Sequence, residues 1–245
     1  DINSKEHIEF ARDVASKSIV LLKNENNILP LSKDINRLFI TGPNAANINT
    51  LLGNYNGLSS NIVTPLEGII SKASNGTIIR FNKGVDLIHN NHGIMESSAS
   101  LAGSSDVTIA IMGISALIEG EQGDAVSSDA NGDRSKIALP KNQINYLKAL
   151  RKRSGNKPII LVIKSGSAID LSEIYDEVDA IIYAWYLGEQ GGNAIADVIF
   201  GDINPSGKLP ITIPESISHL PDYEDYSMNN SCLLYTSPSP RDRVQ

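Results

Sequence analysis

The stretch "DVTIAIMG", from Asp106 to Gly113, decides the fold of this chain. Its residues are apolar or β-branched almost without interruption, whereas a strand with one face in water alternates apolar and polar residues. The pattern therefore predicts a strand that is covered on both faces. Four more runs of the same kind complete the set: Arg37 to Gly42, Gly76 to Phe81, Lys157 to Gly166, and Val178 to Tyr186.

Helical patterns lie between or beside most of these strands, over residues 94–104, 140–154 and 190–202. A further amphipathic helix is predicted from His7 to Lys23, because apolar residues recur there on one helical stripe. Strands and helices that alternate at this spacing predict an α/β fold. We expect an open, mostly parallel sheet with helices on both faces, an α/β sandwich of the flavodoxin-like kind.

The composition is that of an ordinary globular protein, with 41% hydrophobic and 20% charged residues among 245. The formal net charge of -7 disfavours a surface for nucleic acid or for an anionic membrane, since both need clustered Lys and Arg. No apolar run approaches the roughly 20 residues of a membrane-spanning helix. Cys232 is the only cysteine, which excludes an internal disulfide and a CxxC metal site. We therefore expect a neutral ligand, and neither a nucleic-acid nor a membrane partner.

We expect three parts along the chain. Residues 1–25 form an N-terminal helical arm, residues 26–230 form the α/β sandwich, and residues 231–245 stand apart. This last segment, "SCLLYTSPSPRDRVQ", resembles the translation of a sequencing adaptor, and we interpret it as an artefact. The alternative is a genuine disordered tail. The chain starts with Asp1 instead of Met, which predicts a fragment or a processed protein.

An acidic loop leaves the strand that ends at Gly113. It contains "IEGEQGD", in which only Gly120 separates Glu119 from Glu121 and Gly123 follows shortly after. Sheets of this kind bind ligands at the carboxyl ends of their strands, at a topological switch point, so position alone makes this loop a candidate site. A connector needs turn-forming residues but not two carboxylates. The alternative is that both glutamates belong to a solvated surface loop.

Four other features allow a functional and a purely structural interpretation. Tyr55 in "LLGNYNGLSS" and Trp185 at the end of the last strand could stack on a sugar, or could pack on their own domain. The turn "ITGPNAAN" follows a strand as phosphate-binding turns do, but it lacks both glycine-rich phosphate motifs. His89 and His92 are close in sequence, but no acid or cysteine cluster completes a metal site.

Three longer blocks together resemble one known family. They are "ARDVASKSIVLLKNENNILPL", "LLGNYNGLSSNIVTPLEGI" and "WYLGEQGGNAIADVIFGDINPSGKLPITIP". They are similar to the C-terminal α/β sandwich domain of glycoside hydrolase family 3, the β-glucosidases and β-xylosidases, and the resemblance spans Glu6 to Asn230. It implies retaining, exo-acting hydrolysis of β-linked glucosides or xylosides. The implied substrates are oligosaccharides or aryl β-glycosides, and no cofactor is implied.

The resemblance also implies that this chain holds half of an active site. In the family, the nucleophilic Asp belongs to a (β/α)8 barrel that precedes this domain, and a loop of the sandwich domain carries the general acid/base Glu. The implied partner is therefore the barrel of the same intact protein, and a homodimer is a further option. A secreted or periplasmic location is favoured by the resemblance alone. Because one carboxylate cannot perform a double displacement, we expect the isolated chain to be inactive.

The resemblance assigns roles residue by residue. Glu121 best matches the family's Gly-Glu-Gly or Ala-Glu-Gly pattern and is the expected acid/base. Glu119 is the second choice, because "EGE" can be aligned one register away; alternatively it binds a sugar hydroxyl or tunes Glu121. Asp133 and Arg134 match a Gly-Asp-Arg element, which could pin the loop by an ion pair or touch the substrate. The alternative for this pair is a plain turn and a surface charge. Tyr55 is the third candidate for substrate binding.

Two other functions are also compatible with the sequence. One is a non-catalytic module that binds carbohydrate or braces a barrel, in which the acidic loop does no chemistry. The other, a flavodoxin-like ligand-binding domain, rests on architecture alone, and a fold does not determine a function. Glucose and xylose are not distinguished, because the residues that touch the terminal sugar lie mainly in the barrel.

Overall fold

A computed structural model describes residues 3–54, 56–57, 59–120, 134–220, 222 and 224 of the chain. Within these ranges, six strands form one sheet in the order β1-β6-β5-β4-β2-β3. Their bounds are β1 Val20–Asn24, β2 Arg37–Thr41, β3 Ile78–Asn82, β4 Val107–Gly113, β5 Ile159–Lys164 and β6 Ala180–Tyr183. Strand β1 runs antiparallel to β6, and all other neighbours are parallel. The predicted open, mostly parallel sheet is confirmed.

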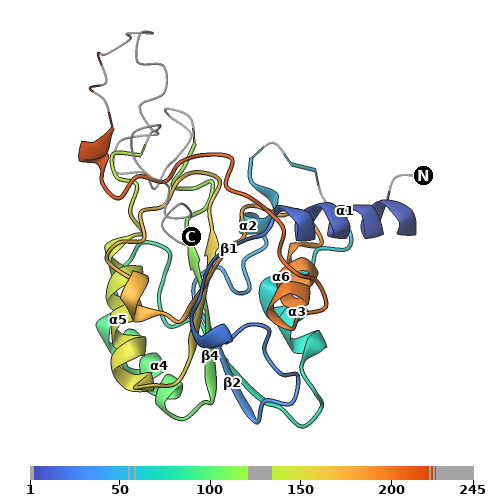
Figure 1. Ribbon diagram of the computed structural model, residues 1–245, viewed down its shortest axis with the longest axis horizontal. Helices are drawn as coiled ribbons and strands as arrows, with labels where there is room; N and C mark the ends of the chain where they lie inside the picture. The colour runs from blue at the N-terminus through green and yellow to red at the C-terminus, as the bar shows by residue number, and fades with distance from the viewer. Residues whose placement is uncertain are drawn as a thin grey trace.

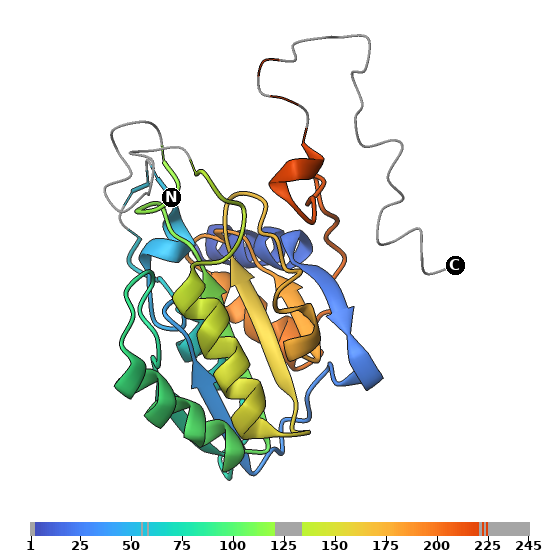
Figure 2. The same cartoon turned by 90° about the vertical axis from the view of Figure 1, so that its left-hand side faces the viewer.

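Helices cover both faces of the sheet, as expected (Figures 1 and 2). One face carries α4 (His92–Gly103) and α5 (Lys141–Ser154). The other carries α1 (Lys5–Ser18), α3 (Pro65–Lys72) and α6 (Gly191–Ile199). The short helices are α2 (Asn49–Leu52) and the single turns η1 (Glu25–Asn27), η2 (Tyr175–Glu177) and η3 (Ile217–His219).

Strand β4 is apolar at nearly every position because it contributes to two cores. Ala110 and Met112 pack with residues of α4 and α5, whereas Ile109 and Ile111 pack with residues of α1, α3 and α6. All seven residues of the strand are buried. Successive side chains of a strand point to opposite faces, so both faces must be apolar when both are covered.

The strand order defines a switch point beside β4. With β1 left aside, the parallel strands follow the flavodoxin-like order, in which the first and third strands are neighbours and their connections leave in opposite directions. These two strands are β2 and β4. The acidic loop therefore leaves from one of the two strands at the switch point, where ligands of such sheets bind.

The helix predicted from His7 to Lys23 is wrong in its second part. Helix α1 ends at Ser18, and from Val20 the chain continues as strand β1, the antiparallel neighbour of β6. Ile19 already has extended backbone, with φ -68° and ψ 132°, as its β-branched side chain favours. The N-terminal arm thus contributes a strand to the sheet, and the domain boundary at residue 25 stays a prediction.

Helix α3 begins with a capping box and crosses α6 closely. The Thr64 hydroxyl accepts the Glu67 N–H at 3.3 Å, the Glu67 carboxylate accepts the Thr64 N–H at 2.8 Å, and Pro65 is the first helical residue. At the crossing, a Cβ on Gly192 would lie 2.1 Å from the Thr64 carbonyl oxygen, and a Cβ on Gly68 would lie 2.1 Å from the Gly192 carbonyl oxygen. Glycine is therefore required at both positions.

Asp197 of α6 joins the three helices on this face of the sheet. Its side chain is 3% exposed. Arg12 of α1 donates to both carboxylate oxygens at 2.7 and 2.6 Å, and the Nζ of Lys72 from α3 lies 2.7 Å from Oδ1. Two cations share one buried carboxylate, so loss of Asp197 would leave both without this partner.

Candidate active site at the carboxyl ends of β4 and β5

The exit from β4 is held in one geometry. Gly113 has φ +131°, and a Cβ there would lie 1.9 Å from the Lys164 carbonyl oxygen, so only glycine fits. The side-chain amide of Gln143, buried on α5, accepts the Gly113 N–H at 2.9 Å and donates to the Gly113 carbonyl at 2.7 Å. The same amide donates to the Leu87 carbonyl at 2.9 Å. The acidic loop thus starts from a fixed point.

The side chain of Glu119 points into the domain. Its Oε1 accepts the N–H of Gly166 at 2.7 Å, and its Oε2 accepts the hydroxyl of Ser167 at 2.7 Å. Both partners belong to the turn that follows β5. The Glu119 side chain is 16% exposed. Both carboxylate oxygens are therefore bound to this turn.

Arg134 is bound to the same turn. Its Nη1 donates to the Ser167 hydroxyl at 2.8 Å and to the Ala168 carbonyl at 3.0 Å, and its Nη2 donates to the Ala138 carbonyl at 3.4 Å. Nη1 also lies 4.0 Å from Oε2 of Glu119. The Arg134 side chain is 12% exposed, and burial lowers the pKa of its guanidinium while the charge of Glu119 opposes that shift. Arg134 is thus a bound cation and not a free surface charge.

Three other predicted site residues, Glu121, Asp133 and Tyr55, lie outside the described residues. Their assignments stay predictions. Glu121 follows Glu119 by two positions, and Asp133 directly precedes Arg134.

Two tyrosines lie next to Glu119 and the turn after β5. The Tyr183 hydroxyl donates to the Ser167 carbonyl at 2.5 Å, and burial raises the pKa of Tyr183 to about 12. Burial, together with the charge of Glu119, also raises the pKa of Tyr186. The Tyr186 hydroxyl is buried and has no hydrogen-bond partner among the described residues. Both phenols therefore stay neutral around the carboxylate.

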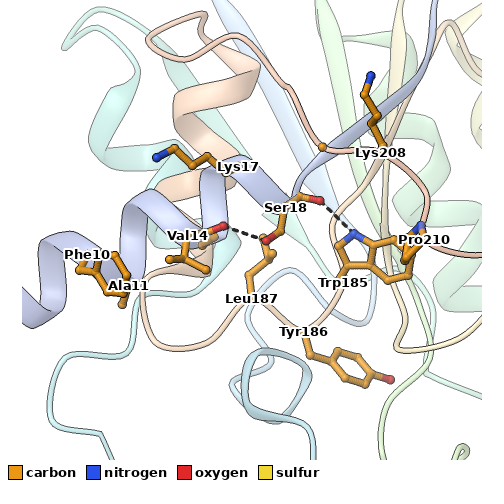
Figure 3. Close-up of a pocket in the computed structure, with 12 residues that line it drawn as sticks. Phe10, Ala11, Val14, Lys17, Ser18, Trp185, Tyr186, Leu187, Lys208 and Pro210 are labelled. Atoms are coloured by element: carbon orange, nitrogen blue, oxygen red, sulfur yellow. Dashed lines mark hydrogen bonds between the residues drawn. The ribbon is translucent and has the colours of Figure 1, made fainter.

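A groove of about 610 Å³ lies beside α1 (Figure 3). Phe10 and Val14 of α1 form one wall, and Trp185, Leu187 and Pro210 form the other. None of its lining residues is acidic, so the groove offers no carboxyl for hydrolysis. The Trp185 indole donates to the Ser18 carbonyl at 3.0 Å, and its ring lies 4.6 Å from that of Tyr183. Trp185 thus packs on its own domain, the second of its two interpretations.

The sequence analysis missed Ser167 and Lys164. Ser167 binds both Glu119 and Arg134. Lys164, the last residue of β5, is fully buried and donates its Nζ to the Ala184 carbonyl at 2.8 Å. Burial lowers the pKa of Lys164 to about 7. A lysine at the end of the apolar run "IILVIK" was the available signal, whereas nothing in the sequence singles out Ser167.

The described part of the chain contains no group of three or more His, Cys, Asp and Glu side chains that could hold a metal ion. Within the same residues, no helix is both long enough and apolar enough to cross a membrane.

Comparisons with known proteins agree on one family. Residues 19–240 match the model of the glycosyl hydrolase family 3 C-terminal domain. A β-xylosidase of Formosa agariphila is 33% identical over 228 residues, which are 90% of this chain and 30% of that protein. A periplasmic β-glucosidase of Salmonella typhimurium is 34% identical over 260 residues, covering 97% of this chain and 32% of that protein.

Solved structures give the same result. A family 3 exo-β-xylosidase in complex with a xylobiose aziridine probe matches 83% of this chain and 25% of its own, with a TM-score of 0.72 and 32% identity. The family 3 β-glucosidase of Bifidobacterium adolescentis matches 92% of this chain and 32% of its own, with a TM-score of 0.78 and 28% identity. The chain therefore spans about a third or less of the length of these relatives. From the matched domain and these relatives together, the chain belongs to glycosyl hydrolase family 3, and it corresponds to the C-terminal α/β domain of that family.

Proposed function

We propose that this chain is the C-terminal domain of a retaining, exo-acting β-glycosidase and that Glu121 is its general acid/base. The substrates would be β-xylosides or β-glucosides, the two classes named for its relatives. An N-terminal barrel of the intact protein would supply the nucleophilic carboxylate. The resemblance to family 3 supports the division of the site between two domains, since the chain covers only about a third of its relatives.

The hydrogen bonds of Glu119 support Glu121, rather than Glu119, as the general acid/base. A general acid must turn an oxygen toward the glycosidic oxygen of the substrate, within hydrogen-bond reach. Glu119 instead turns one oxygen to the Gly166 N–H and the other to the Ser167 hydroxyl. Glu121 is the remaining glutamate of the "EGE" motif. This supports Glu121 over Glu119.

The proposed chemistry is a double displacement. Retaining enzymes place their two carboxyl groups about 5 to 5.5 Å apart. The barrel carboxylate attacks the anomeric carbon while Glu121 protonates the leaving oxygen. Glu121, now ionised, then takes a proton from the water that hydrolyses the glycosyl-enzyme bond. The chain by itself holds one partner of this pair, so the isolated chain would not hydrolyse an aryl β-glycoside.

The test compares Glu121→Gln with Glu119→Gln in the intact enzyme. The two variants make the same chemical change two residues apart, so each is the matched control for the other. We expect Glu121→Gln to lower kcat/KM on an unactivated disaccharide by about 100-fold to 10,000-fold, and on an aryl glycoside with a good leaving group much less, because kcat/KM reports the first step, in which only the disaccharide needs a proton donor.

Equal losses of Glu121→Gln on both substrates would contradict the assignment. Leaving-group dependence that appears in Glu119→Gln alone would transfer the role to Glu119. An intact protein that binds glycans in the absence of both carboxylates, and hydrolyses none, would instead identify a non-catalytic carbohydrate-binding or bracing module.

A further inference from the structure

Two residues that flank the acidic segment 121–133 are hydrogen-bonded to one turn, residues 166–168 after β5. Glu119 lies just before the segment and Arg134 just after it. The two side chains meet at the hydroxyl of Ser167, which donates to Oε2 of Glu119 at 2.7 Å and accepts from Nη1 of Arg134 at 2.8 Å. One hydroxyl thus links Glu119 to Arg134.

The turn that receives them is itself braced. The Ser165 hydroxyl donates to the Ser167 carbonyl at 2.7 Å and accepts the Ser167 N–H at 3.2 Å. The buried Tyr183 hydroxyl donates to the same carbonyl at 2.5 Å. A Cβ on Gly166 would lie 2.5 Å from Oε1 of Glu119, so glycine is needed for the close approach of the carboxylate. The anchoring point is therefore a hydrogen-bonded turn at the carboxyl end of β5, an inner strand of the sheet.

We propose that Glu119, Arg134 and Ser167 form an anchor that positions the general acid/base, a role that rests on the proposed function of Glu121. Two peptide units span at most roughly 7 Å, so a fixed Glu119 restricts where Glu121 can lie. Arg134 restricts the far end of the segment in the same way. Misplacement of a reacting group by about 1 Å can cost a factor of about 100 in rate, which is why such an anchor matters. The three residues are positioning residues and make no contact with the reacting atoms.

In the anchor, the negative charge of Glu119 compensates the positive charge of Arg134. Arg134 is 12% exposed and its other described partners are the neutral Ser167 hydroxyl and two carbonyls. Glu119, at 4.0 Å, supplies the opposite charge. Removal of Glu119 would leave a largely buried guanidinium without that charge, and this destabilises the fold as well as the loop. Ser167→Ala removes the shared hydroxyl and leaves both charges in place, so it is the cleaner perturbation.

The test uses the intact enzyme, with kcat and KM measured on a disaccharide and on an aryl glycoside with a good leaving group. We expect Ser167→Ala to lower kcat on the disaccharide about 10-fold to 100-fold, with a smaller loss on the aryl glycoside and KM changed by less than about twofold. Glu119→Ala should show the same pattern, more strongly. The control is Ser172→Ala, an exposed serine that follows the same strand, which should match the wild type.

Azide separates a positioning residue from the acid/base. Azide attacks a glycosyl enzyme without help from a base, so it should accelerate Glu121→Ala on the aryl glycoside. It should accelerate Glu119→Ala and Ser167→Ala far less, because both keep the Glu121 carboxylate as a base. A second readout is independent of activity: the Gly166 amide should exchange with solvent faster in Glu119→Ala, since that variant removes its acceptor.

The failures of the two proposals are distinguishable. If Glu121→Ala behaves as expected but Ser167→Ala and Glu119→Ala keep the wild-type leaving-group dependence, the anchor is wrong and the proposed function stands. If azide accelerates Glu119→Ala and not Glu121→Ala, Glu119 is the acid/base and both proposals are overturned.

Discussion

Lys164 allows a direct test of how burial lowers a lysine pKa and makes the stability of this fold depend on pH. It ends β5 in the interior, with its Nζ bound to the Ala184 carbonyl at 2.8 Å. Burial lowers its pKa from 10.5 to about 7, because the charged ammonium loses its hydration there. In the unfolded chain the side chain regains its ordinary pKa.

The direction of the effect on stability follows from proton binding. Between pH 7 and 10.5 the unfolded chain binds a proton at Lys164 that the folded chain does not, so the free energy of unfolding rises with pH across this window. Well below pH 7 the penalty for burying the charge is fully present. The difference between 10.5 and about 7 corresponds, at about 1.4 kcal/mol per pH unit, to about 5 kcal/mol.

The perturbation is Lys164→Met, which keeps an unbranched side chain and removes the charge. We expect the variant to be more stable than the wild type at pH 6 by about 4 kcal/mol, after about 1 kcal/mol is subtracted for the lost hydrogen bond to Ala184. The advantage should shrink steadily as the pH rises to 10. The assay is urea unfolding of both chains at several pH values, which compares free energies of unfolding at each pH.

Lys152→Met is the matched control, because Lys152 is an exposed lysine on α5 and should give no pH-dependent difference of this size. A difference between wild type and Lys164→Met that is the same at pH 6 and pH 9 would refute the reasoning. That result would mean that Lys164 keeps its proton in the folded protein over the whole window.

The two remaining predictions concern the face of the sheet that carries α1, α3 and α6. Asp197→Asn should lower the free energy of unfolding by about 2 to 4 kcal/mol, measured by urea unfolding, because Arg12 and Lys72 lose their buried counter-charge. A loss below about 0.5 kcal/mol would show that the network is not stabilising. Gly192→Ala should cost at least about 2 kcal/mol, because its Cβ would strike a carbonyl oxygen of the α3 cap. Gly76→Ala, where a Cβ meets open space, should stay within about 0.5 kcal/mol of the wild type, and equal effects of the two substitutions would contradict the packing argument.

The sheet was predictable because its strands are buried on both faces. In β4, Ile109 and Ile111 meet one layer of helices while Ala110 and Met112 meet the other, and a continuous apolar run records that arrangement directly. Strand β1 was not predictable in this way. Leu22 continues the apolar stripe of the preceding helix, and the strand conformation around it depends on pairing with β6, more than 150 residues further along the chain.

The candidate site was predictable only in part. The acidic loop and its place after β4 follow from the sequence, as does the pairing of carboxylates in "EGE". The partners of Glu119 do not follow, because one is a backbone N–H, that of Gly166, and the other is Ser167, 48 residues away. A backbone donor has no signature in the sequence, and a single serine in a turn is too common to be singled out.

The antiparallel strand β1 has a practical consequence for anyone who shortens this protein. A truncation at residue 25 would follow the boundary suggested by the helical pattern, yet it would strip the outermost strand from the sheet. The backbone of Ala180–Tyr183 would then face solvent along an apolar border, a template for pairing with another molecule. Truncated protein should therefore aggregate, and a soluble version of the domain should begin before Lys5, where α1 starts.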